Sequence, residues 1–158
     1  MDGIIFRPAS ACDARLWAET RQKAWSATYR GIYPDSWIDQ YDYAGKEQID
    51  AGRLADPNIF SFLVMDGETC AGYFSYGPVA AGAFYLRSLY LLPEYQGRGI
   101  GRKIIETLEA DEYALRSKRI DLPASITGRD FYLKFGYAYK GGIKDLYPDR
   151  CYRLEKFI

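Results

Sequence analysis

The stretch YLLPEYQGRGIGRK, from Tyr90 to Lys103, changes from an apolar run to a glycine-rich turn and then to the start of a helical pattern. Glycines allow a backbone to approach a ligand closely, and the N–H groups at the head of a helix favour negative charge. The turn therefore predicts a phosphate-binding site, and its glycine spacing distinguishes between the known types.

Three glycine patterns compete for this turn. The Walker loop fails because no hydroxyl residue follows Gly101 at the required place, and the dinucleotide fingerprint fails because Arg102 stands where its third glycine belongs. The pattern Gln-x-x-Gly-x-Gly is filled without a gap by Gln96, Gly99 and Gly101. On these six residues alone, a strand-to-helix turn that needs glycines only for its dihedral angles remains the alternative.

Composition limits the classes of protein. A chain of 158 residues with 48% hydrophobic and 27% charged residues is typical of one globular domain, residues 1–158. Lys+Arg and Asp+Glu balance at 21 each, so we expect no nucleic-acid partner, and no apolar run is long enough to predict a membrane partner. Histidine is absent, which excludes histidine-based triads and nearly all zinc-hydrolase sites, so no metal is expected.

The cysteines indicate the compartment. Cys12, Cys70 and Cys151 are odd in number, far apart and in no CxxC pattern. This spacing is typical of reduced thiols rather than of a disulfide framework or a metal cluster. The start of the chain lacks the pattern of a signal peptide, and we expect a cytoplasmic protein.

Hydrophobic periodicity predicts one mixed α/β unit. Ser10 and Asp13 form a capping-box pattern, Pro34 suits the first turn of a second helix, Pro123 weakens the end of the fifth strand, and Gly136 stops the last helix. Three β-rich runs before the glycine turn suggest an antiparallel meander. The predicted helices cover 13–29, 35–41, 46–54, 99–116 and 128–136, and the predicted strands cover 3–8, 59–65, 69–77, 83–92, 119–125, 137–143 and 150–158.

Two motifs resemble those of the GNAT (GCN5-related N-acetyltransferase) superfamily. LYLLPEYQGRGIGRKIIETLE, residues 89–109, is similar to its acetyl-CoA motif, and SITGRDFYLKFGY, from Ser125 to Tyr137, is similar to Asn-x-x-Ala-x-x-Phe-Tyr-x-Lys-x-Gly-Phe/Tyr. AWSATYRGIYP and YRLEKFI also look typical, so the resemblance covers the whole chain. It implies a mostly antiparallel, mixed central sheet that is flanked by helices and splayed between strands 4 and 5.

The resemblance also implies the cofactor site. Acetyl-CoA would be the cosubstrate, with its pantetheine arm between the parted strands and bonded to the amides of Leu89 and Leu91. Ser125 stands where the family has an asparagine that touches pantetheine, so that contact would be shorter or absent, and Gly128 replaces an alanine. Besides Gln96, the residues implied at the pyrophosphate are Gly97, Arg98, Gly99, Ile100, Gly101 and Arg102. For Arg98 and Arg102, the alternative is a solvated cation at the helix end.

The implied reaction is direct acetyl transfer to a primary amine of a small molecule or a peptide. Tyr132 matches the family's general acid, and its alternative role is a core aromatic residue. At neutral pH only about one alkylammonium in a thousand is free base, a handicap of roughly 4 kcal/mol, so a base is needed. With histidine absent, the candidates for the base are a carboxylate, a tyrosine and a water chain. Tyr85 is the nearest equivalent of a glutamate that some members of the family carry. Glu94 is better interpreted as a solvated or capping residue of the turn, and the base stays unassigned.

The acceptor is left open by the sequence. Several aromatic residues and carboxylates near the first two helices would suit a cationic acceptor, but they equally suit helix packing and the helix dipole. Arg87 instead favours an acceptor that carries a carboxylate, which its guanidinium would bind. The sequence also leaves open a homodimer, another nucleophile, a longer acyl group, and a non-catalytic acyl-CoA sensor of the same fold. The aromatic and acidic residues are Tyr29, Tyr33, Trp37, Tyr41, Tyr43, Asp35, Asp39 and Asp42.

Overall fold

The computed structural model describes residues 3–79 and 82–158 and contains a seven-stranded sheet of order β1-β2-β3-β4-β5-β7-β6. β1 pairs with β2, β5 with β7, and β6 with β7 in the antiparallel sense, whereas β4 and β5 run parallel. The predicted mixed, mostly antiparallel sheet is therefore confirmed. The strands are β1 (Ile4–Pro8), β2 (Phe60–Asp66), β3 (Thr69–Pro78), β4 (Phe84–Leu91), β5 (Arg119–Ser125), β6 (Ala138–Tyr139) and β7 (Cys151–Phe157).

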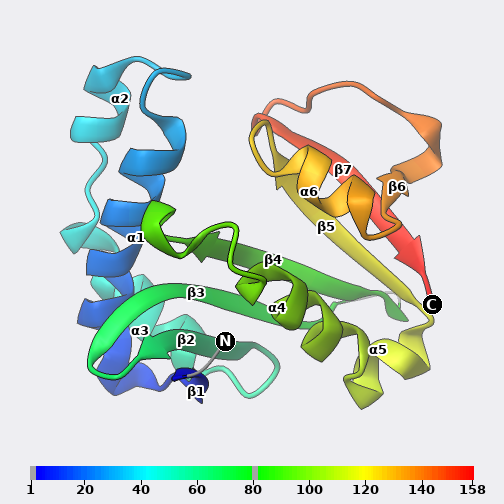
Figure 1. Ribbon diagram of the computed structural model, residues 1–158, viewed down its shortest axis with the longest axis horizontal. Coiled ribbons are helices and arrows are strands. Elements are labelled where there is room, and N and C mark those ends of the chain that lie inside the picture. Colours follow the sequence, from blue (N-terminus) through cyan, green and yellow to red (C-terminus); the bar gives the residue numbers. More distant parts are fainter. Residues whose placement is uncertain (1–2, 80–81) are drawn as a thin grey trace. The chain divides into compact units, whose positions relative to one another are not determined.

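Helices connect these strands at nearly all the predicted places (Figure 1). Short 3-10 turns precede α1 and α3, and another, η4 (Pro93–Tyr95), lies between β4 and α4. Pro34 lies just before α2, at its N-cap, and not in its first turn. The α-helices are α1 (Ala14–Tyr29), α2 (Asp35–Asp39), α3 (Glu47–Ala55), α4 (Ile100–Glu109), α5 (Glu112–Ser117) and α6 (Arg129–Lys134).

The chain forms two compact units. The first unit consists of Met1–Ser75 with Ser88–Ile104, and the second consists of Tyr76–Arg87 with Ile105–Ile158. β3, β4 and α4 each run from one unit into the other, so the two units are joined by continuous secondary structure. Each unit has its own buried residues and is described separately below.

The core of the first unit lies between helices and sheet. Trp17 of α1, Leu54 of α3, Leu63 of β2 and Tyr73 of β3 are buried in one cluster, and the rings of Trp17 and Tyr73 lie 4.5 Å apart. Figure 1 shows α3 alongside α1. Burial of such large side chains stabilises the unit by roughly 2 kcal/mol each.

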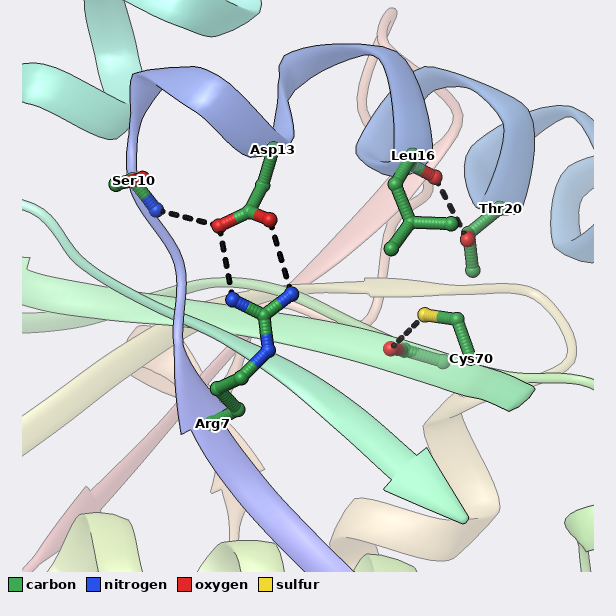
Figure 2. A network of polar contacts seen from close by, with 7 residues as sticks. Arg7, Ser10, Asp13, Leu16, Thr20 and Cys70 are labelled. Atoms are coloured by element: carbon green, nitrogen blue, oxygen red, sulfur yellow. Dashed lines mark hydrogen bonds and ion pairs between the residues drawn. The ribbon is translucent and has the colours of Figure 1, made fainter. Parts of the chain in front are cut away.

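The entry into α1 is fixed by a charged pair that Figure 2 shows from close by. The Ser10 N–H donates to the Asp13 carboxylate at 2.9 Å, and the Arg7 guanidinium donates to both oxygens of that carboxylate at 3.2 and 2.9 Å. These bonds, those from Arg7 first, hold the pKa of Asp13 below its usual value. The Ser10–Asp13 contact agrees with the predicted start of this helix.

The second unit is built around β5. β7 pairs with all seven residues of this strand, and Ile120, Leu122 and Leu154 are almost fully buried. The end of β5 is therefore not weakened at Pro123, contrary to the prediction. The β4 ladder stops at Tyr85↔Asp121, two residues before the proline, so no bond on that side is lost.

Two further predictions were wrong in detail. The helix expected over 99–116 is broken after Glu109, because the side chain of Asp111 accepts the Tyr113 N–H at 2.9 Å and starts α5 as its N-cap. The strand expected over 137–143 has only the two residues of β6. Gly141 and Gly142 then turn the chain with positive φ angles of 62° and 72°.

Candidate active site

The glycine turn in the first unit is held in place by the side chains that precede it. The Tyr95 hydroxyl donates to the Asp66 carboxylate at 2.9 Å, which ties η4 to the end of β2. The Gln96 amide donates to the Leu91 carbonyl at 3.0 Å, so this residue bends the turn back onto the end of β4. Gln96 therefore supports the loop through its side-chain NH₂ group.

The loop itself presents bare backbone at the head of α4. Gly97 and Gly99 have φ angles of 71° and 81°, which L-residues rarely adopt, and the loop from Gln96 to Gly99 is exposed. A Cβ added to either glycine would meet no atom within 4 Å, so both positions open onto free space. Ile100 is only 1% exposed, so its side chain belongs to the core and only its N–H could face a ligand.

This arrangement suits a diphosphate. The first N–H groups of a helix have no acceptor within the helix, and they carry the positive end of its dipole. The first bond of α4 runs from the Lys103 N–H to the Gly99 carbonyl at 3.1 Å, so Ile100, Gly101 and Arg102 lie in this first turn. The Arg98 guanidinium lies 5.0 Å from the centre of the Tyr95 ring and adds positive charge at the loop.

Gly72 of β3 has a role that sequence reasoning missed. A Cβ at this position would lie 2.2 Å from the Tyr90 carbonyl oxygen, so only glycine permits this approach of β3 to β4. The Leu92 N–H donates to the Ala71 carbonyl at 2.8 Å beside it. The close approach fixes the segment that contains Leu89 and Leu91, both of them half-buried. A glycine inside a β-rich run was the available signal.

The second motif, from Ser125 to Tyr137, lies in the second unit. Its two departures from the family pattern, Ser125 and Gly128, contact each other. The Ser125 hydroxyl accepts the Gly128 N–H at 3.0 Å and lies 3.3 Å from the Thr127 hydroxyl. A Cβ at Gly128 would lie 3.0 Å from the Ser125 Oγ and 3.5 Å from the Tyr132 ring. Ser125 therefore starts the turn into α6, and glycine at position 128 gives its hydroxyl room.

Tyr132 lies on α6 within an aromatic group. Its side chain is 7% exposed, and its ring lies edge-on to Phe131 at 5.2 Å and to Tyr137 at 5.9 Å. Tyr137 is a second residue that sequence reasoning missed. Its pKa is raised by desolvation and by the nearby Glu109 carboxylate, and Lys156 donates to Glu109 at 2.8 Å. The motif itself, which ends at Tyr137, was the signal.

An aromatic run extends within the first unit from β4 to α2, and its residues are half-buried except for the exposed Trp37. The Tyr29 and Tyr90 hydroxyls share a hydrogen bond of 2.8 Å, and successive ring centres from Tyr29 through Tyr33 to Trp37 lie 5.3 and 6.2 Å apart. The centre of the Trp25 ring lies 6.1 Å from that of Tyr29 and 5.8 Å from that of Tyr90. We call these five residues the aromatic run. Its outer end, Trp37, is 52% exposed.

The carboxylates beside this run are engaged within the protein. Arg30 pairs with Asp35 at 3.3 Å and with Asp39 at 2.8 Å. Asp42 accepts the Gly45 N–H at 2.7 Å. The aromatic residues and carboxylates that the sequence singled out are thus brought together, but the acidic ones already have partners.

Tyr85, considered as the base, and Arg87, considered as a partner of an acceptor carboxylate, lie in the part of β4 that belongs to the second unit. Burial raises the pKa of Tyr85, although the nearby Arg153 guanidinium opposes this effect. Arg153 itself donates to both oxygens of Asp149 at 3.2 and 2.7 Å. Arg87 is exposed, and so is Glu94 in the first unit, which agrees with its expected place in a surface turn. A raised pKa makes Tyr85 a poor base at neutral pH.

Comparison with known proteins gives a consistent result. The model of the acetyltransferase (GNAT) family matches residues 17–137. The spermidine N(1)-acetyltransferase of Thermoplasma acidophilum is 27% identical over 146 residues, which cover 89% of this chain and 88% of that protein.

Solved structures agree in fold over nearly the whole length. The PaiA N-acetyltransferase of T. acidophilum, in complex with coenzyme A, has a TM-score of 0.80 at 22% identity and covers 98% of this chain and 99% of its own. An acetyltransferase from Thermus thermophilus has a TM-score of 0.76 at 19% identity, and the match covers 98% of this chain and 97% of that protein. Within residues 3–79 and 82–158, no helix has the length and apolar character needed to span a membrane.

Proposed function

This chain belongs to the acetyltransferase (GNAT) family, and from that premise we propose that it transfers an acetyl group from acetyl-CoA to a primary amine of a small molecule or a peptide. The observation that carries the proposal is the exposed glycine loop at the head of α4. Its N–H groups can donate hydrogen bonds to the phosphate oxygens, and the positive end of the helix dipole favours their negative charge. The complex of a structural neighbour with coenzyme A supports the same cosubstrate.

Residues of the glycine loop, of β4 and of the second motif would each bind a different part of acetyl-CoA. Amides from Gly97 to Arg102 would hold the pyrophosphate, while the amides of Leu89 and Leu91 would bind the pantetheine arm as a neighbouring strand would. Acetyl-CoA supplies the thioester carbonyl. Ser125 keeps only a short hydroxyl side chain, which already accepts the Gly128 N–H, so its contact with pantetheine would be weak.

Tyr132 would act as the general acid. The amine nitrogen forms a bond to the thioester carbon and loses one proton, the carbon–sulfur bond breaks, and the departing thiolate takes a proton from the Tyr132 hydroxyl. The Tyr132 phenolate then regains a proton from water, which also receives the proton of the amine. Packing between Phe131 and Tyr137 would keep this ring in one orientation. With histidine absent and the pKa of Tyr85 raised, we propose that water carries the proton away from the amine.

A non-catalytic acyl-CoA sensor is the second candidate, because the sequence and the site identify no side chain as the base. Thiol release from acetyl-CoA, measured with a panel of alkylamines, polyamines and peptides, separates the two functions. An acetyltransferase releases coenzyme A with at least one amine, whereas a sensor binds coenzyme A and releases none. Longer acyl-CoA donors and alcohol acceptors in the same assay test the donor and the nucleophile.

We also propose that residues 1–158 act as one domain in the cytoplasm. β3, β4 and α4 pass through both compact units, which supports one domain. Cys12, Cys70 and Cys151 are free thiols, which supports a reducing compartment.

A further inference from the structure

The aromatic run begins at the segment proposed to bind the cofactor. Tyr90 lies between Leu89 and Leu91 in β4, and its hydroxyl bonds to Tyr29 of α1 at 2.8 Å. From there the rings continue within the first unit to Trp37, which is 52% exposed. An acceptor that reaches the proposed thioester along this surface would lie against aromatic faces, and the run can therefore determine specificity.

The charges around this surface do not suit a polycation. Asp35 and Asp39 share the Arg30 guanidinium, and Asp42 accepts a backbone N–H. Asp50 forms a buried pair with Arg21. Basic and acidic residues are equal in number between 14 and 55, so the segment has no net negative charge to attract a molecule with several ammonium groups.

Two aromatic rings in this part of the first unit already have a cation of the protein beside them. The Arg21 guanidinium lies 5.9 Å from the centre of the Trp25 ring, and the Lys46 ammonium lies 6.0 Å from the centre of the Tyr41 ring. Both distances fall within the range of a cation–π contact. Trp25, which belongs to the aromatic run, therefore already has a cation beside its ring and gains less from an ammonium group of a ligand than from an uncharged apolar group.

We propose that the acceptor is a monoamine on an aromatic or apolar body, such as an arylalkylamine, and not a polyamine. This inference rests on the proposed acetyltransferase function. The aromatic run would bind the apolar body, and the single amine would be presented to the thioester. The spermidine acetyltransferase that is 27% identical would then differ from this chain in its acceptor.

The direct test compares kcat/KM for 2-phenylethylamine, hexylamine and spermidine with acetyl-CoA held saturating. We expect 2-phenylethylamine to exceed spermidine by at least about tenfold, the discrimination that an apolar pocket commonly provides. A spermidine value equal to or above that of 2-phenylethylamine would overturn the inference and leave the proposed function intact. Absence of coenzyme A release with every amine would overturn both.

Two variants locate the effect on this surface. Trp37→Ala should lower kcat/KM for 2-phenylethylamine about tenfold while the KM for acetyl-CoA stays within twofold. Ile49→Ala, at a residue of α3 that is 49% exposed and outside the run, is the matched control and should change neither. Equal kinetics for Trp37→Ala and wild type would contradict the inference.

The third variant frees the carboxylates. Arg30→Gln leaves Asp35 and Asp39 without their cation, so kcat/KM for spermidine should rise about fivefold while that for 2-phenylethylamine stays within twofold. A spermidine value that does not rise would show that the pairing of Asp35 and Asp39 with Arg30 is not what excludes polyamines, and it would count against the proposal.

Discussion

Tyr132 is the residue on which the proposed chemistry depends most. Tyr132→Phe removes only the hydroxyl, so the packing with Phe131 and Tyr137 is kept. We expect kcat to fall about a hundredfold, as for loss of a general acid, with the dissociation constant of coenzyme A within twofold. Steady-state thiol release and calorimetry measure the two quantities.

Tyr113→Phe is the matched control, because Tyr113 is an exposed tyrosine of the same unit. It should leave both quantities unchanged. If Tyr132→Phe instead lost affinity for coenzyme A and kept its turnover, Tyr132 would be a packing residue only.

Asp13 gives the fold a pH dependence whose sign follows from its partners. Arg7 and the Ser10 N–H lower its pKa below the ordinary 3.8, so the pair stabilises the fold fully above that pH. The stabilisation is lost as the pH falls through the lowered pKa. Asp13→Asn should therefore cost about 1 kcal/mol of unfolding free energy at pH 7, and the difference from wild type should shrink below pH 3.8.

Urea unfolding at several pH values measures this difference. Asp145→Asn, at an exposed aspartate in the loop before β7, serves as the control and should have the stability of wild type throughout. A constant difference between wild type and Asp13→Asn down to pH 2 would refute the assignment.

At the scale of elements, the pairing of β3 with β4 depends on Gly72. In Gly72→Ala the new Cβ would lie 2.2 Å from the Tyr90 carbonyl oxygen, and the strands must separate to admit it. We expect a loss of about 3 kcal/mol in unfolding free energy. Gly52→Ala in α3 meets no atom within 4 Å and should be neutral or stabilising by up to about 1 kcal/mol.

Chemical denaturation of both variants decides the point. Equal stability of Gly72→Ala and Gly52→Ala would mean that β3 and β4 do not approach as closely as described.

The elements that the sequence predicted well are those with strong local patterns. The β-rich runs, the Ser10–Asp13 start of α1 and the glycine turn each follow from a few neighbouring residues. The break between α4 and α5 was missed because the apolar spacing continues through it, although Asp111 is a common N-cap residue. The length of β6 was overestimated because Gly141 and Gly142, which follow this strand, adopt positive φ angles.

The candidate site was predictable in part for the same reason. The loop residues and Tyr132 lie in contiguous motifs, and the family match confirms the resemblance on which they rest. The pairing of Arg30 with Asp35 and Asp39 was not predictable, because it depends on how α1 and α2 are oriented. A glycine in a β-rich run and the end of the second motif marked Gly72 and Tyr137, but their contacts with Tyr90 and Glu109 join residues distant in sequence and were not predictable.

At the scale of the whole molecule, the proposal of one domain predicts one cooperative unfolding transition. All three tryptophans, Trp17, Trp25 and Trp37, lie in the first unit, so their fluorescence reports on that unit, whereas far-ultraviolet circular dichroism reports on both. Because β3, β4 and α4 run through both units, the two melting curves should coincide. Curves separated by more than about 5 °C would show that the units unfold independently.

The central claim, that the backbone at the head of α4 binds the diphosphate of coenzyme A, is tested most directly by calorimetric titration of coenzyme A into three proteins. Gly99→Val and Gly67→Val impose the same kind of strain, since both glycines have positive φ angles, of 81° and 61°, with no atom within 4 Å of an added Cβ. We predict that Gly67→Val binds like wild type and that Gly99→Val binds at least about tenfold more weakly. Undiminished affinity in Gly99→Val, or no binding to the wild type, would contradict the account.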